Sequence, residues 1–213
     1  MAQPVLRRRV LAGLMGAAAV VGAWGWQRLS VPAVELPEAE VCLDAPALPY
    51  DPASGLAMTD PRPVPDGARC PVCGMYPGRF AEWAAQAIFN DGYVHFFDSP
   101  LSLFTFLDDV ERFSPGRTAR DIAVCYVTDS AQIAPPAWVA AADAFYVHGS
   151  NALGPMRSGN LPAFAEQAAA QAFVQRRGGV VLSFAQVDAV VLRQLVVPGG
   201  HQHSAHVAAS GRT

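Results

Sequence analysis

The stretch that decides the fold is "WAAQAIFNDGYVHFFDSPLSLFTFLDDVERF", residues 83–113. Two apolar runs, residues 83–90 and 93–98, flank the dipeptide Asp91-Gly92. Asp-Gly between two apolar runs is a strong signal for a tight turn that joins antiparallel strands. The stretch therefore begins with a predicted β-hairpin.

A helix is predicted directly after the hairpin, over residues 99–113. Asp98 and Ser99 are residue types that cap helix N-termini, and Pro100 suits the first helical position. Apolar residues then recur at helical spacing, at Leu101, Phe104, Leu107 and Val110. The next segment, "DIAVCYVTD" at residues 121–129, predicts a third strand. The order is strand, strand, helix, strand.

The same order recurs further along the chain. "DAFYVHG" (143–149) predicts a strand, and "NLPAFA" (160–165) predicts a second, short strand. "EQAAAQAFVQRRG" (166–178) predicts an alanine-rich amphipathic helix that ends at Gly178, because glycine is favoured just past a helix C-terminus. "GVVLSFAQV" (179–187) predicts the closing strand.

This repeated order predicts an α+β fold of two homologous ββαβ units in tandem. The first lobe spans residues 68–130 and the second spans residues 131–197. Eight prolines in residues 31–67 predict a Pro-rich extended linker, in which "LPYDP" (48–52) is expected to lie against the body like a strand. Residues 198–213 are predicted to be a disordered, histidine-containing tail.

Residues 1–30 resemble a targeting segment. Three consecutive arginines precede the uncharged apolar run "VLAGLMGAAAVVGAWGW", residues 10–26, and this order directs export. Two alternatives remain: cleavage after the small residues 21–23, or retention of an N-terminal apolar helix as a membrane anchor. Both place the body outside the cytoplasm.

The charge pattern excludes whole classes of function. The net charge is −3, and all 15 basic residues are arginines scattered along the chain. Because no basic face is indicated, nucleic acid is excluded as a partner. The sequence also lacks a constellation of nucleophile, base and orienting acid, which favours a binding protein over an enzyme.

The four cysteines do not form two close pairs. Only Cys70 and Cys73 are neighbours, whereas Cys42 stands in the linker and Cys125 stands in an apolar strand. A four-cysteine zinc site normally needs two close pairs, so a zinc ribbon is disfavoured. Cys125 is predicted to be a small buried side chain, and Cys42 is either free or paired with another cysteine.

The Cys70–Cys73 pair itself allows three interpretations. A thioredoxin-like redox motif needs a helix directly behind it, but Gly74, Pro77 and Gly78 follow here. A structural disulfide is the second interpretation, because exported proteins commonly oxidise such pairs. The third is a metal site in the loop that precedes the first predicted strand.

Methionines favour a soft-metal site. Gly74 allows the backbone to turn so that the Cys73 thiolate and the Met75 thioether face one ion, and this ligand pair selects copper(I). In the second lobe, Met156 lies in a glycine-flanked loop where it has no evident core to fill, and His148 ends the strand before it. The alternative roles are ordinary ones: Met75 as a gap-filling side chain and His148 as a satisfied strand-end residue.

The remaining histidines carry weaker signals. His95 alternates with its apolar strand neighbours and is therefore expected to face solvent. His201, His203 and His206 lie within six residues of the tail, "HQHSAH", and such tracts bind divalent metals when flexible. They form a candidate secondary metal site.

Three blocks in order resemble the NosL family, the copper-binding accessory proteins encoded with nitrous oxide reductase. They are "CPVCGM" (70–75), "FFDSP" (96–100) and "GSNALGPM" (149–156), and the resemblance covers residues 70 to about 190. It implies two homologous ββαβ units and a protein that binds copper(I) in the periplasm. It also implies that copper passes to the reductase through a membrane-bound partner complex.

The resemblance extends to single residues. Cys73 and Met75 match the copper motif of the family, Cys70 matches its preceding cysteine, and Met156 matches the methionine of the second lobe. One departure is that no cysteine for lipid attachment stands at residues 24–30, directly after the apolar run. Either the N-terminal helix anchors the protein or the chain is released.

The leading hypothesis is a copper(I) metallochaperone. Cys73 and Met75 are expected to hold the ion, with Met156, His148 or Cys70 completing the ligand set. The runner-up is a thiol-disulfide oxidoreductase that uses Cys70 and Cys73, and a third hypothesis is an interaction module with a structural disulfide. The role of Cys70 stays open between third ligand, redox guard and bystander.

Overall fold

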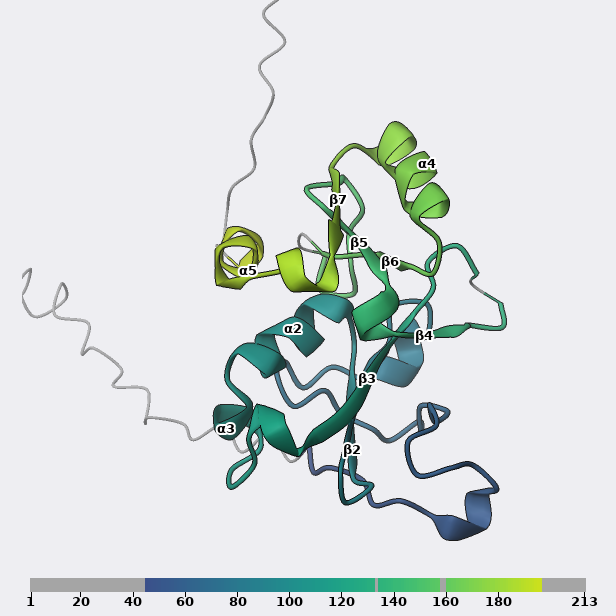
Figure 1. Cartoon of the computed structure of the whole chain (residues 1–213), viewed down its shortest axis with the longest axis vertical. Coiled ribbons are helices and arrows are strands. Elements are labelled where there is room, and N and C mark those ends of the chain that lie inside the picture. Colours follow the sequence, from purple (N-terminus) through teal and green to yellow (C-terminus); the bar gives the residue numbers. More distant parts are fainter. Residues whose placement is uncertain (1–44, 133, 158–159, 197–213) are drawn as a thin grey trace, which may run out of the picture. The chain divides into compact units, whose positions relative to one another are not determined.

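A computed structural model describes residues 45–132, 134–157 and 160–196 (Figure 1). The predicted N-terminal targeting segment, residues 31–44 of the linker with Cys42, and the histidine tail lie outside these residues. None of the described helices is long and apolar enough to cross a membrane. The described part contains two antiparallel sheets together with helices, which confirms the predicted α+β class.

The first sheet has the strand order β2-β1-β3-β4. Its strands are β1 (Ala85–Phe89), β2 (Val94–Phe97), β3 (Ile122–Thr128) and β4 (Trp138–Ala140). The predicted hairpin is confirmed, because β1 and β2 pair antiparallel around a turn at Gly92. Gly92 has φ +83°, and a Cβ there would lie 2.8 Å from the Cβ of Tyr50, so only glycine fits this turn.

The helix predicted over residues 99–113 is divided in two. Helix α2 spans Pro100–Asp108 and α3 spans Val110–Phe113. Between them Asp109 leaves helical geometry (φ −148°, ψ 76°), and its side chain accepts a hydrogen bond from the backbone N–H of Arg112. An aspartate favours this capping role over a helix interior, which explains the break.

The second sheet has the strand order β6-β5-β7. Its strands are β5 (Phe145–His148), β6 (Ala163–Phe164) and β7 (Val180–Ser183), and α4 spans Gln167–Arg177 before β7. Gly178 is the C-cap of α4, as predicted. The closing strand is shorter than predicted, because Ser183 and Gln186 form a capping box that starts a 3₁₀ turn.

Three strands of the first sheet are arranged like the three strands of the second. β1 pairs antiparallel with β2 and β3, and β5 pairs antiparallel with β6 and β7, whereas β4 is added at the β3 edge of the first sheet. Two elements were not predicted: β4 and α5 (Ala189–Val196). The 3₁₀ turns are Pro52–Ser54, Pro77–Phe80, Ala119–Asp121, Ala141–Asp143 and Phe184–Gln186.

One hydrophobic cluster contains side chains from both sheets. Phe97 and Phe106 of the first half are buried in the same cluster as Tyr146 and Leu161 of the second. The Tyr146 ring lies 5.0 Å from the ring centroid of Phe104 on α2, and its hydroxyl donates to the Ala141 carbonyl at 2.7 Å. The two halves therefore bury apolar surface against one another.

A second, smaller cluster covers the other face of the first sheet. Leu48 forms an isolated bridge with Val94, which confirms that this piece of the linker lies against the body. Val64 and Ala68 of the same segment pack with Phe96. As a result β2 is buried on both faces.

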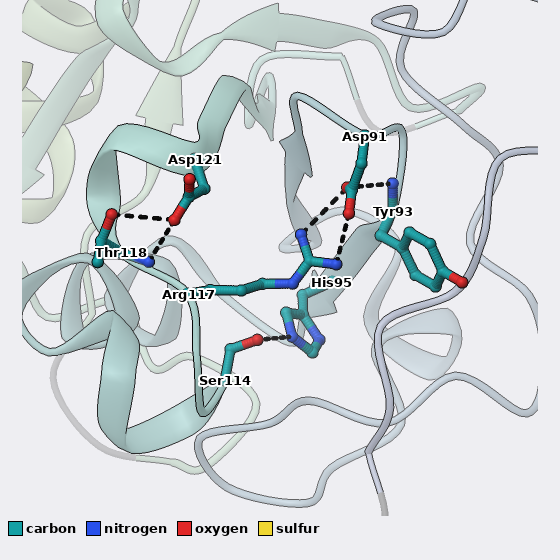
Figure 2. A network of polar contacts seen from close by, with 7 residues as sticks. All are labelled: Asp91, Tyr93, His95, Ser114, Arg117, Thr118 and Asp121. Carbon is teal, nitrogen blue, oxygen red and sulfur yellow. Dashed lines mark hydrogen bonds and ion pairs between the residues drawn. The ribbon is translucent and has the colours of Figure 1, made fainter.

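This double burial makes the prediction for His95 wrong. His95 is only 3 % exposed, and its ring lies 5.5 Å from the ring centroid of Phe106. Its Nε2 lies 3.2 Å from the Ser114 hydroxyl (Figure 2). Burial, assisted by the charge of Arg117, lowers the pKa of His95 to about 4.

Arg117 covers this histidine region at the surface. Its guanidinium forms an ion pair with Asp91 at 2.8 Å (Figure 2). It also lies 4.1 Å from the ring centroid of Phe89. Thr118 and Asp121 form a capping box beside it. The charged groups of this network therefore have their partners within it: each other, an aromatic ring and backbone N–H groups.

Candidate metal centre

The loop that carries Cys70, Cys73 and Met75 closes on itself through the backbone. The N–H of Cys70 donates to the carbonyl of Met75 at 2.9 Å, and the N–H of Gly74 donates to the carbonyl of Cys70 at 2.8 Å. Gly74 has φ +73°, which allows the chain to reverse between the two bonds. The residues of the motif are therefore held in a tight turn rather than on a helix.

The turn brings both thiols to the carboxylate of Asp98. The two sulfur atoms and one carboxylate oxygen lie within 4.8 Å of one another. Asp98 directly follows β2, so the sheet holds the carboxylate while the loop holds the thiols. Among histidine, cysteine, aspartate and glutamate side chains in the described ranges, this is the one group of three that such a distance joins.

Asp98 is a functional candidate that the sequence reasoning missed. It is fully buried, accepts a hydrogen bond from the Cys73 thiol at 3.1 Å and accepts another from the Ser102 hydroxyl at 2.7 Å. Its second oxygen, Oδ2, is buried with no hydrogen-bond partner. A buried acceptor without a partner is costly, so this oxygen is suited to a cation or another donor that enters the site.

The predicted capping role of Asp98 is wrong, whereas that of Ser99 is confirmed. The Ser99 side chain accepts the N–H of Ser102 and caps α2. Only one residue can occupy the cap position, so two cap-type residues in succession were the signal that one of them has another task.

The pKa values of the two thiols are shifted in opposite directions. Burial raises the pKa of Cys70, but hydrogen bonds from the Cys73 side chain and from backbone groups outweigh it and lower the pKa overall. The pKa of Cys73 is raised, first by its hydrogen bond with Cys70 and then by burial. One proton is therefore retained on Cys73, where it faces the Cys70 sulfur and the Asp98 carboxylate.

The exposure of the thiols runs opposite to what redox catalysis needs. Cys70, whose pKa is lowered, is 0 % exposed, whereas the partly exposed Cys73 has the raised pKa. A catalytic thiol must be both ionised and accessible. Both cysteines are free thiols, with no disulfide between them in the structure.

Cys125, predicted to be buried, is partly buried. It lies on β3 opposite Ala87 and packs against the main core. Burial raises its pKa to about 12, so it is neither a ready ligand nor a reactive thiol. It lies outside the Cys70–Cys73–Asp98 group.

The structure does not bring His148 into this group. His148 ends β5, and its Nε2 lies 3.0 Å from Oε1 of Gln194 on α5. Its Nδ1 is buried without a hydrogen-bond partner. Met156 lies in the loop after β5 and is 58 % exposed. The tail histidines His201, His203 and His206 lie outside the described residues.

Chemically, the group offers two sulfur donors and one carboxylate in a nearly dry environment. Within the described part of the chain, no arginine or histidine forms an ion pair with Asp98. A cation that displaces the thiol protons would therefore meet three acidic groups that have no cationic partner among the described residues. Thiolates select soft or borderline metals, a class that includes copper, and Met75 of the same loop carries a further soft donor.

The sequence matches the model of a known protein family. A sequence model of the NosL family matches residues 61–192, a span that contains the thiol loop, Asp98, His148 and Met156. No curated protein matches the sequence.

A solved structure shares the fold. The chain is similar to the crystal structure of the copper chaperone NosL from Shewanella denitrificans, with a TM-score of 0.51 and 23% sequence identity. The match covers 62% of this chain and 97% of that one.

Proposed function

We propose, from the premise that this chain belongs to the NosL family, that it is a copper(I) metallochaperone and not an enzyme. The observation that carries the proposal is the convergence of the Cys70 and Cys73 sulfurs with the Asp98 carboxylate. Copper(I) is bound by Cys73 with the thioether of Met75, and Cys70 is the nearest further sulfur. Met156 and His148 are donors that complete the ligand set when their loop and strand end move towards the ion.

The site is built to release its ion as well as to bind it. Cys73 is partly exposed, and Met156 is 58 % exposed on its loop. Loop-borne soft donors can be replaced one at a time by the donors of an acceptor protein. Copper transfer then proceeds by ligand exchange, without a free ion in solution.

The cellular role follows from the family and the N-terminal sequence. The chain is proposed to act in the periplasm, released or anchored by residues 1–30, and to supply copper for assembly of nitrous oxide reductase. Its partners are the reductase and a membrane-bound delivery complex. The two halves are further proposed to descend from one ββαβ unit, which the matching strand orders β2-β1-β3 and β6-β5-β7 support.

A competition titration tests copper binding. Cys73→Ser is compared with wild type for copper(I) affinity against a chelator of known affinity, under reducing conditions. Loss of the sulfur donor is expected to weaken binding at least about 100-fold, a free-energy change of about 2.7 kcal/mol. Cys125→Ala is the matched control, because it removes a thiol outside the site, and its affinity is expected to equal that of wild type. Unchanged tight binding by Cys73→Ser would overturn the proposal.

The oxidoreductase alternative has one observation in its favour, the lowered pKa of Cys70. Against it, that thiol is fully buried. An insulin-reduction assay separates the two functions, because a chaperone is expected to show no turnover above the uncatalysed rate. Turnover lost in Cys70→Ser but retained in Cys125→Ala would establish the enzyme instead.

A further inference from the structure

A pocket with a volume of about 220 Å³ is lined by residues other than those of the thiol group. Its walls come from the turn before β1, the loop after β5 and helix α4. The lining residues include Glu82, Trp83, Leu153, Pro162, Phe173 and Arg177. None of them takes part in the proposed copper site.

The walls of this pocket are held in place by the fold. Phe173 packs against Phe164 with ring centroids 5.1 Å apart. The backbone N–H of Asn151 donates to the carbonyl of Arg177 at 3.0 Å, which fixes the loop to the end of α4. In the same loop, a Cβ on Gly154 would lie 1.7 Å from the side chain of Asn160, so this contact requires glycine. The pocket is therefore preformed, which reduces the ordering cost of binding.

Its size and lining fit a single large side chain. The volume is below the roughly 300–1,000 Å³ of typical small-molecule sites. Trp83 and Phe173 provide aromatic surface, and Leu153 at the loop adds an apolar side chain that is 58 % exposed. Aromatic anchors that fill such pockets dominate many protein–protein interfaces.

The pocket also carries two opposite charges without partners. Within the described ranges neither Glu82 nor Arg177 forms an ion pair, and the closest hydrogen bond of the Arg177 guanidinium is a long one, 3.4 Å, to the neutral side chain of Asn151. Both charges are thus available to an occupant. The complementary occupant has an acidic group on the Arg177 side and a basic group on the Glu82 side.

The residues that line this pocket are close in sequence to both ligand-bearing loops. Leu153 stands three residues before Met156, and Trp83 stands ten residues after Cys73, beyond the 3₁₀ turn Pro77–Phe80. A protein seated in the pocket would contact the segments that carry the proposed soft donors. Copper exchange requires such proximity between donor and acceptor ligands.

We propose that this pocket is a docking site for a protein partner, which inserts an aromatic side chain flanked by one acidic and one basic residue. That this partner is the copper acceptor rests on the proposed function, whereas the docking itself does not.

Peptide titration of the copper-free full chain tests the docking. The probes are N-acetyl-Asp-Trp-Arg-amide and N-acetyl-Arg-Trp-Asp-amide. The two peptides carry the acidic and basic residues in opposite order, so that both chain directions of the partner are tested. Shifts in the amide NMR spectrum are followed to millimolar peptide. We expect one of the two to shift residues of the pocket, and to bind at least about fivefold more tightly than N-acetyl-Asn-Trp-Gln-amide.

Matched variants locate the binding. Arg177→Glu is expected to weaken the better peptide about tenfold, whereas Arg176→Glu makes the same charge change on a neighbouring exposed residue outside the pocket and is expected to change it little. Replacing the peptide tryptophan by alanine is expected to abolish the shifts. The proposal would be overturned if the alanine peptide bound as tightly as the tryptophan peptide. It would also be overturned by equal effects of the two arginine variants, or by the absence of pocket shifts with either peptide.

The result is independent of copper. If wild type failed to bind copper(I) yet bound the peptide as described, the proposed function would fall and the docking site would stand. If copper binding held and the peptide result failed, the docking site would fall alone.

Discussion

Two titratable groups lie three residues apart around β2, and the structure treats them in opposite ways. His95, within the strand, is enclosed by aromatic rings and bonds to Ser114, while the nearby Arg117 is paired with Asp91. Asp98, just past the strand, faces two thiols and keeps one buried oxygen without a partner. Both are almost inaccessible to solvent.

The difference shows that burial of a titratable group does not by itself indicate a site. Around His95, apolar contacts make the neutral form the stable one, and in the described ranges it belongs to no group of three metal-ligating side chains. Around Asp98, two thiols from a separate loop converge, and within the described residues no arginine or histidine pairs with the carboxylate. The first arrangement stabilises the fold, and the second prepares a place for a cation.

The largest effect is expected from opening the aromatic cage of His95. Phe106→Ala removes a fully buried ring that contacts His95, Phe97 and Phe113. Loss of this packing should destabilise the fold by about 3–5 kcal/mol, measured by denaturant unfolding. Copper(I) affinity of the protein that stays folded should be unchanged, because Phe106 offers no ligand. A large loss of affinity in the folded fraction would show that the two regions are not separate.

Acid should act on the His95 region next. The folded pKa of His95 is about 4 and its ordinary value is 6.5, so the unfolded chain binds the proton first as pH falls. Its contribution is therefore complete above about pH 6.5 and declines by up to about 3 kcal/mol towards pH 4.

His95→Phe is the variant that isolates this contribution. The difference in unfolding free energy between wild type and variant should change across this pH window and stay constant above it. A difference that is independent of pH from 7 to 4 would contradict the assignment.

A smaller effect is expected from neutralising the carboxylate at the other end of the strand. Asp98→Asn keeps the shape and a hydrogen-bond acceptor for Ser102 but removes the negative charge. Groups that support a metal site from beside its ligands typically change affinity 10–100-fold, so we expect copper(I) binding to weaken about tenfold, or about 1.4 kcal/mol.

The thermal stability of Asp98→Asn should not fall, because a buried, partly unsatisfied charge has been removed. Asp91→Asn is the control for a carboxylate outside the site. Equal copper(I) affinities of the two variants would show that Asp98 does not contribute to the copper site.

The smallest effect is expected from the surface pair beside His95. Asp91→Asn breaks its ion pair with Arg117, whose partners are 52% and 23% exposed. Exposed pairs contribute about 0.2–1 kcal/mol, and salt screens them. The destabilisation should therefore shrink as salt is raised. A loss above about 2 kcal/mol would mean that Arg117 depends on this pair to cover the histidine.

Much of the first half was predictable because its signals are local. Asp91-Gly92 identified the hairpin, and Ser99 with Pro100 identified the start of α2. Helix α5 was missed although Asp188, whose side chain accepts the backbone N–H groups of Val190 and Val191, marks its start. The sequence pattern of β2 also gave no warning that both faces are covered, since the cover comes from distant residues such as Leu48 and Phe106.

The residues of the candidate site were also predictable only where their signals are local in sequence. Cys70, Cys73 and Met75 are neighbours in sequence, so their chemistry was readable there. Asp98 joins them only through the fold, across 25 residues from Cys73. Its role was hidden because an aspartate before a helix already has an ordinary explanation as a cap.

The most direct test of the central claim is X-ray absorption at the copper edge of the copper(I)-loaded protein. We predict a first shell dominated by sulfur, which loses a sulfur scatterer in Cys73→Ser and keeps its composition in Cys125→Ala. A first shell of nitrogen and oxygen alone, or one that is identical in wild type and Cys73→Ser, would contradict the claim that the thiol loop beside Asp98 holds the ion.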